Sequence, residues 1–128
     1  MLTRIKNLLH NNAIYFAVLT TVSIGVLSLI KMPSDGIPIA SSDKFLHTVA
    51  YFFLMLTWLY SFSKKEHFYK KVKYIILGCF IYGIVLEVSQ GAFTSYRTGS
   101  YLDILANSLG IVLAVLAFHL FEKKIRFN

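Results

Sequence analysis

The chain has 128 residues, of which 56% are hydrophobic and only 15% are charged. A soluble domain of this length has too little interior to bury so much apolar surface, and a mean hydropathy of +0.62 excludes a disordered chain. The formal net charge is +7, from 13 Lys and Arg against 6 Asp and Glu, and the single cysteine excludes an intrachain disulfide. A soluble enzyme is therefore disfavoured.

Apolar runs long enough to cross a membrane recur along the sequence. A spanning helix needs about 18 to 20 nearly uncharged residues, because each residue rises about 1.5 Å through about 30 Å of hydrocarbon. Lipid offers no partner to the backbone, so such runs must be helical. Four stretches meet the criterion: 13–30, 45–62, 74–92 and 104–121. The sequence thus predicts an all-α membrane protein, a single domain over 1–128 built as a four-transmembrane-helix bundle.

The first run has some features of a secretory signal, since Arg4 and Lys6 precede it and Ile39–Ser41 loosely imitates a cleavage site. Its apolar stretch is longer than a usual signal core, so we expect it to be retained as a spanning helix.

The sequence contains no internal repeat, and the loops between the runs are too short to hold a second domain.

The placement of the basic residues predicts the orientation of the bundle. Ten of the 13 Lys and Arg lie near the two termini or between the second and third runs, and three lie in the other two loops. Because cytoplasmic loops are enriched in Lys and Arg, both termini and the middle loop are expected to be cytoplasmic. Basic clusters between apolar runs are typical of membrane orientation, so we predict no nucleic-acid partner.

The remaining polar residues gather at the outward-facing end of the predicted bundle. They are Asp43, Lys44, His47 and Tyr51 in the second helix, Glu87 and Gln90 in the third, Arg97 and Ser100 in the following loop, and Asp103 and Asn107 in the fourth helix. Many recur at intervals of three or four and so share a helix face. Small residues, Ala106, Gly110 and Ala114, accompany them in the fourth helix and permit close helix contact. Such faces are expected to turn into the bundle.

Ionisable groups within a membrane are functional candidates by default, so these residues predict a binding site. The ligand that we expect there is an anionic or phosphorylated lipid headgroup. The predicted ligand-binding residues are Asp43, Lys44, Tyr51, Gln90, Arg97, Ser100 and Asn107, with Lys44 and Arg97 holding phosphate oxygens. His47, Glu87 and Asp103 are the candidate catalytic residues, able to move protons if a reaction occurs. No cofactor is predicted. A divalent cation among Asp43, His47, Glu87 and Asp103 is a less favoured alternative, since an ion-pair network explains the same residue types.

The ordered set of motifs, from Asp43-Lys44 through His47, Tyr51, Glu87, Gln90, Arg97, Ser100, Asp103 and Asn107 to Gly110, resembles the VanZ-like family of small bacterial membrane proteins. The resemblance implies a four-helix integral protein of the bacterial cytoplasmic membrane, in a family named for a member associated with lowered susceptibility to the glycopeptide teicoplanin. It brings no settled reaction. Antibiotic resistance is not transferred to this chain, whose outer loops are too short for a large drug-binding platform.

Two other classes of function stay open at this point. The polar residues can act as structural glue that fixes helix packing in an assembly protein, which is the stronger alternative for Asn107 and Gln90 taken alone. A proton-coupled transporter is less favoured, because the inner halves of the runs contain no ionisable relay. The expected partners are therefore the lipid bilayer and an anionic envelope lipid, and the sequence predicts no oligomeric state.

Overall fold

The computed structural model is helical throughout the residues that it describes, which are 1–29, 39–63, 67–93 and 101–127. Its helices are α1 (Leu2–Asn11), α2 (Ala13–Leu29), α3 (Ile39–Phe62), α4 (Phe68–Phe93) and α5 (Tyr101–Phe127). Within these ranges the side chains at 39–44, 90, 91, 93, 101 and 123–127 are not described. The predicted all-α class is confirmed for this part of the chain.

Three helices are long and apolar enough to cross a membrane. The qualifying segments are Phe45–Phe62 in α3, Phe68–Ser89 in α4 and Leu102–Glu122 in α5. Helices α1 and α2 pass the same test only as a pair, bent by 47° where they meet. On length and composition, the described residues thus hold three spans, or four if the bent pair is one span.

The bend between α1 and α2 was not predicted, because the first apolar run begins at residue 13 and no helix was expected before it. It falls at Asn12, whose side-chain amide donates a hydrogen bond of 2.8 Å to the carbonyl oxygen of Leu8. Asn side chains compete in this way with the backbone hydrogen bonds of a helix, so they favour helix ends. α1 therefore ends at Asn11, and α2 begins at Ala13 in a new direction.

The helices also extend beyond the apolar runs that predicted them. α4 begins at Phe68 instead of residue 74, and Lys70, Lys71 and Lys73 form part of its first turns. α3 begins at Ile39 instead of 45, and α5 spans Tyr101–Phe127 instead of 104–121. Hydropathy locates the part of a helix that lies in hydrocarbon, whereas lysine is a good helix former and can continue the helix into the headgroup region.

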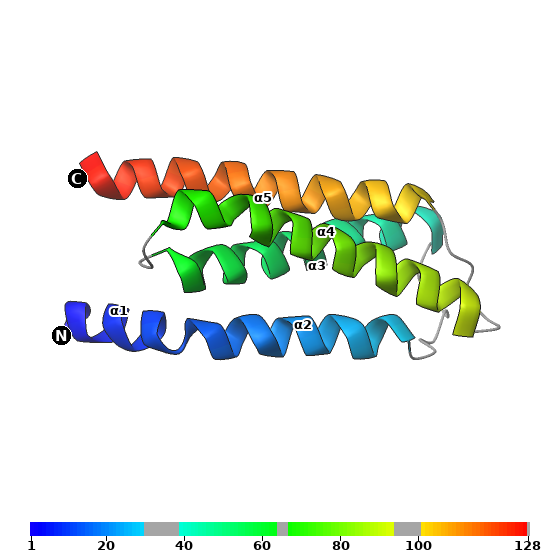
Figure 1. Cartoon of the computed structure of the whole chain (residues 1–128), viewed down its shortest axis with the longest axis horizontal. Coiled ribbons are helices and arrows are strands. Elements are labelled where there is room, and N and C mark those ends of the chain that lie inside the picture. The colour runs from blue at the N-terminus through cyan, green and yellow to red at the C-terminus, as the bar shows by residue number, and fades with distance from the viewer. Residues whose placement is uncertain (30–38, 64–66, 94–100, 128) are drawn as a thin grey trace.

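The ends of the helices fall into two groups (Figure 1). The N terminus, the end of α3, the start of α4 and the C-terminal part of α5 lie at one end of the bundle. The ends of α2 and α4 and the starts of α3 and α5 lie at the other end. We refer to the second group as the His47 end of the bundle. This arrangement brings the first turns of α3 and α5 and the last turns of α4 to the same level.

A close helix contact joins α3 to α5 at Gly110. A Cβ atom at Gly110 would overlap the carbonyl oxygen of Thr48 and would lie 2.9 Å from the backbone nitrogen of Phe52. Ala106 and Ala114, one turn to either side, are also buried. The predicted face of small residues in the fourth apolar run is therefore confirmed as a helix contact, and the absence of a side chain at Gly110 lets the two backbones approach.

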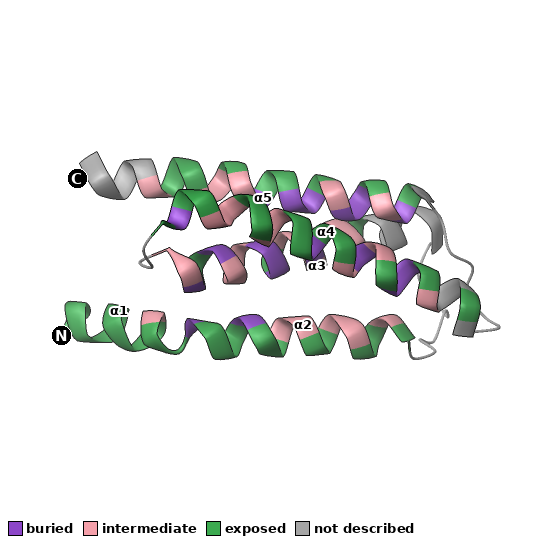
Figure 2. Cartoon of the chain, viewed as in Figure 1, coloured by how far each residue is buried: buried purple, intermediate pink, exposed green. Residues whose placement is uncertain are grey.

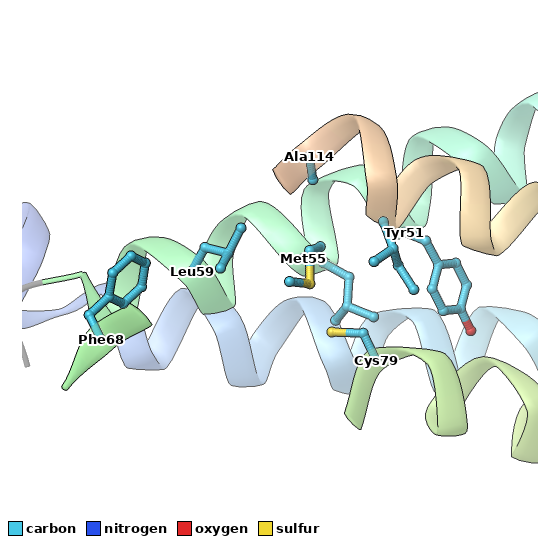
Figure 3. Close-up of a cluster of buried hydrophobic side chains, with 8 residues drawn as sticks. Tyr51, Met55, Leu59, Phe68, Cys79 and Ala114 are labelled. Carbon is cyan, nitrogen blue, oxygen red and sulfur yellow. The ribbon is translucent and has the colours of Figure 1, made fainter. Parts of the chain in front are cut away.

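An apolar core continues from this contact toward the opposite end of the bundle. Leu54, Met55 and Leu59 of α3 are at most 1% exposed and pack in one cluster with Cys79 of α4, as Figure 3 shows for Met55, Leu59 and Cys79. The outward helix faces are exposed and rich in large apolar residues, visible as green bands in Figure 2. Extensive apolar exposure is what a bundle surrounded by lipid requires.

Helix α2 attaches to this core through polar contacts at Thr21. The Trp58 indole nitrogen donates to the Thr21 hydroxyl over 3.0 Å, and the Tyr82 hydroxyl donates to the backbone carbonyl of Thr21. A Cβ atom at Gly25 would lie 2.7 Å from the same Tyr82 hydroxyl, so Gly25 makes room for it. Interhelical hydrogen bonds of this kind contribute about 0.6 to 1.7 kcal/mol in membrane bundles.

Candidate functional site

The candidate site is assembled from three helices at the His47 end of the bundle. α3 contributes His47, α4 contributes Glu87, and α5 contributes Asp103 and Asn107. Asp103 and Asn107 are four residues apart on α5 and therefore point to the same side of that helix. Because the three helices reach the same level here, residues that are up to 60 positions apart in sequence come into contact. We call His47, Glu87, Asp103 and Asn107 the polar cluster.

A hydrogen bond between α3 and α5 orients the imidazole ring of His47. The His47 Nδ1 atom lies 3.0 Å from the side-chain oxygen Oδ1 of Asn107. An amide oxygen only accepts hydrogen bonds, so with this orientation of the amide group Nδ1 carries the hydrogen and donates it. In the neutral ring the lone pair then resides on Nε2, which leaves that nitrogen as the acceptor or metal-ligating atom.

The two carboxylic residues of the cluster are withdrawn from the surface. Glu87 is 3% exposed and Asp103 is 5% exposed, although both belong to helices whose outward faces are apolar. One ligand atom each from His47, Glu87 and Asp103 lies within 4.8 Å of the other two. Groups this close interact strongly in a medium of low polarity, so the three side chains act as one unit.

Tyr51 and Gly83 form the floor of the polar cluster. Tyr51 is 3% exposed, and its hydroxyl points toward α4 in Figure 3. A Cβ atom at Gly83 would lie 3.1 Å from the amide nitrogen of Asn107 and 3.2 Å from the Tyr51 ring. Gly83 thus lets Tyr51 and Asn107 pack directly against α4. Below this level lies the hydrophobic cluster that contains Leu54, Met55 and Leu59.

The structure brings together five of the residues that the sequence singled out, namely His47, Tyr51, Glu87, Asp103 and Asn107. Asp43, Lys44 and Gln90 lie on helices whose backbone is described, one turn from the cluster in sequence, but their side chains are outside the described part. Arg97 and Ser100 fall outside the described residues altogether. Their predicted roles in ligand binding therefore stay predictions.

One polar residue at the site was missed from the sequence. The Thr48 hydroxyl lies 3.2 Å from the carbonyl oxygen of Ala106 and donates a hydrogen bond from α3 to α5. Thr48 follows His47 directly and precedes Tyr51 by one helical turn, and that spacing was the available signal. Together with the Gly110 contact, this bond holds α3 against α5 beside the cluster.

Two grooves elsewhere on the bundle are apolar. One, of about 410 Å³, lies between α2, α3 and α4 and is lined in part by Trp58 and Tyr82. The other, of about 540 Å³, lies between α2, α3 and α5 and is lined in part by Phe16 and Phe118. Neither contains a residue of the polar cluster, and apolar grooves on a membrane bundle are accessible to acyl chains. The buried carboxylates of the described residues, Glu87 and Asp103, therefore lie at the His47 end and outside both grooves.

Comparison with known proteins identifies a matching family and a relative in yeast. The family model described as VanZ/LLP1 matches residues 2–122. An uncharacterized protein of Schizosaccharomyces pombe is 31% identical over 93 residues, which cover 71% of this chain and 55% of that protein. The chain thus spans about half the length of this relative. No solved structure matches the chain.

Proposed function

Because this chain belongs to the VanZ/LLP1 family and carries a buried polar cluster in an apolar helical bundle, we propose that it is a multi-pass membrane protein whose cluster binds the headgroup of an anionic or phosphorylated lipid. The observation that carries the proposal is the meeting of His47, Glu87 and Asp103 within 4.8 Å, from three different helices. Binding is the function proposed for the cluster, and the catalytic roles of His47, Glu87 and Asp103 stay predictions.

The energetic cost of the cluster favours a functional role. Glu87 lies near the end of α4 and Asp103 lies in the first turn of α5, so each costs less than the about 2.5 to 3.5 kcal/mol of a carboxylate at the centre of a spanning helix, but ionisable residues within spanning segments mark ligand or ion sites by default. Helix packing alone does not require this cost, since Gly110 and Thr48 already join α3 to α5 through backbone proximity and a neutral hydrogen bond. The cluster therefore adds buried carboxylates beside an α3–α5 contact that Gly110 and Thr48 already hold.

The sequence supplies basic residues next to the cluster. Lys44 precedes His47 by three residues, close to one helical turn, and Arg97 lies in the segment between α4 and α5. In the proposed site these two side chains bind the phosphate oxygens of the headgroup, Arg97 through its planar fork. Ser100 and Gln90 are proposed to hydrogen-bond the remaining polar atoms of the headgroup.

We place the protein in the cytoplasmic membrane of a bacterium, with both termini cytoplasmic and the His47 end facing outward. The support is the excess of Lys and Arg at the opposite end, where Lys70, Lys71 and Lys73 begin α4. The bacterial location follows from the family resemblance alone, and a relative also occurs in yeast.

Single cysteines test the proposed orientation. In a Cys79→Ser background, cysteines at Ser41 and Ser100 are expected to react with a membrane-impermeant maleimide added to intact cells. A cysteine at Ser63, which follows α3 at the other end of the bundle, is expected to react only after the cells are lysed. Labelling of Ser63→Cys in intact cells together with protection of the other two would reverse the orientation.

Charge-neutralising variants test headgroup binding. The wild-type chain in nanodiscs of phosphatidylcholine doped with phosphatidic acid is expected to retain the anionic lipid selectively, as measured by native mass spectrometry after detergent extraction. Arg97→Gln and Lys44→Gln are each expected to weaken retention by about tenfold or more, because a hydrogen bond to a charged group contributes about 1.5 to 3 kcal/mol.

Lys70→Gln provides the matched control, because it removes an equal charge from the opposite end of the bundle. It is expected to leave lipid retention unchanged. Equal losses from Lys70→Gln and Arg97→Gln would point to nonspecific attraction of anionic lipid. Reduced amounts of folded Arg97→Gln and Lys44→Gln in the membrane, with no change in retention per folded chain, would instead support the assembly role.

A further inference from the structure

The polar cluster contains the donor atoms that divalent metal ions bind in proteins. We propose that His47, Glu87 and Asp103 together bind one divalent transition-metal ion of the Zn²⁺ or Mn²⁺ class. Imidazole nitrogen suits first-row transition metals, and carboxylate oxygen binds both Zn²⁺ and Mn²⁺. The inference deepens the headgroup site proposed above and rests on it only for the phosphate group that would complete the coordination.

The geometry of the three side chains fits a single ion. Their ligand atoms all lie within 4.8 Å of one another. A metal-to-ligand distance of about 2.1 Å separates two ligand atoms by at most about 4.2 Å, so binding one ion would require the side chains to move slightly closer together. The ligands come from α3, α4 and α5, and a bound ion would therefore tie the three helices together.

The surroundings of His47 match those of a metal-ligating histidine. Such a histidine donates its other ring N–H to a carboxylate, a carbonyl or water, which fixes the tautomer and the ring orientation. The Oδ1 atom of Asn107, 3.0 Å from Nδ1, takes this role, so Nε2 would be the ligating atom of the ring. Asn107 is itself 3% exposed, and it packs over Gly83.

Charge balance also favours a cation at this position. Glu87 and Asp103, when ionised, place two negative charges in a buried site, and a divalent ion with neutral His47 compensates both.

Three protein ligands leave part of the coordination shell open. Sites of this kind complete the shell with water or with an oxygen atom of a substrate. At the His47 end of the bundle, that oxygen would come from the phosphate of a lipid headgroup or from free phosphate. The metal ion would then hold the phosphate directly, and Lys44 and Arg97 would neutralise its remaining charge.

Equilibrium dialysis of the full-length chain in neutral detergent tests this site without any lipid. After treatment with EDTA and buffer exchange, the wild-type protein is expected to bind one Mn²⁺ or Zn²⁺ per chain, as measured by elemental analysis. Glu87→Gln and Asp103→Asn are expected to weaken binding by more than about 100-fold, which exceeds the 10–100-fold loss typical of an outer partner. Lys44→Gln and Arg97→Gln are expected to retain the metal ion.

A second readout uses only the wild-type chain, in case a ligand variant does not fold. Mn²⁺ is expected to raise its thermal unfolding temperature, and EDTA is expected to reverse the rise, because a ligand that binds only the folded state stabilises it. Failure of folded wild-type protein to bind a stoichiometric ion, or unchanged binding by Glu87→Gln and Asp103→Asn, would overturn the metal site.

The metal site and the headgroup site can fail separately. Stoichiometric metal binding with no preference of the nanodisc-embedded chain for phosphatidic acid would keep the metal site and overturn the headgroup proposal. Selective lipid retention by a chain that binds no stoichiometric metal ion would do the reverse. The oxygen ligand can come from phosphatidic acid or from free phosphate, and inorganic phosphate added in detergent compares these two sources. If phosphatidic acid and inorganic phosphate each bind the metal ion through a phosphate oxygen, inorganic phosphate is expected to compete with phosphatidic acid.

Discussion

The Gly110→Ala variant is expected to be less stable than the wild type by about 2 kcal/mol or more. The added Cβ atom would overlap the Thr48 carbonyl oxygen and would lie 2.9 Å from the Phe52 backbone nitrogen. Both obstacles are backbone atoms of α3, so neither can move aside by a change of rotamer, and overpacking of a tight contact typically costs about 1 to 3 kcal/mol. Thermal unfolding in detergent, followed by the fluorescence of Trp58, measures the effect.

Gly78→Ala is the matched control, since it makes the same chemical change in the interior of a helix. A Cβ atom at Gly78 meets nothing within 4 Å, and alanine is a better helix former than glycine by up to about 1 kcal/mol. This variant is expected to equal or exceed the wild type in stability. Similar losses from both substitutions would mean that α3 and α5 do not approach closely at Gly110.

The Asn107→Ala variant is expected to bind metal about 10- to 100-fold more weakly while still binding one ion per chain. The substitution removes the acceptor for the His47 Nδ1–H group and leaves the three proposed ligands in place. An outer partner of this kind orients the ring and fixes its tautomer, and its loss typically weakens metal affinity by this factor. Dialysis against buffered Mn²⁺ measures the change.

Ser108→Ala controls for a lost side-chain hydrogen bond in the same turn of α5. The Ser108 hydroxyl donates only within its own helix, to the carbonyl oxygen of Ile104 over 2.8 Å. Its replacement is expected to leave metal affinity unchanged. If Asn107→Ala lowered stability but left the affinity per folded chain unchanged, Asn107 would serve helix packing, which is the alternative that its amide side chain suggested from the sequence.

Helix phase in the sequence was enough to anticipate much of the cluster. Ionisable residues in an apolar run have few places to lie other than the bundle interior, and the three- and four-residue spacings placed Asp103 and Asn107 on one face. The small residue Gly110 marked a close contact for the same reason. These inferences needed only the periodicity of an α-helix and the energetics of burying charge.

Pairings between helices could not be obtained in this way. His47 and Asn107 are 60 residues apart, and no periodicity within one helix specifies which residue of another helix it meets. The hydrogen bond from Thr48 to Ala106 was missed for the same reason, since its acceptor is a backbone carbonyl that every residue has. The starts of α3 and α4 and both ends of α5 were misplaced, because the apolar run ends where the hydrocarbon ends, whereas the hydrogen-bonded helix continues beyond it.

The most direct test of this account is the magnetic coupling between bound Mn²⁺ and lipid phosphorus. With the wild-type chain in nanodiscs that contain phosphatidic acid, electron–nuclear double resonance is expected to detect phosphorus nuclei coordinated through oxygen to the ion. The Asp103→Asn variant is expected to lose both the bound ion and the coupling. Mn²⁺ that binds stoichiometrically to the wild type with no phosphorus coupling would contradict a metal-assisted headgroup site at His47, Glu87 and Asp103.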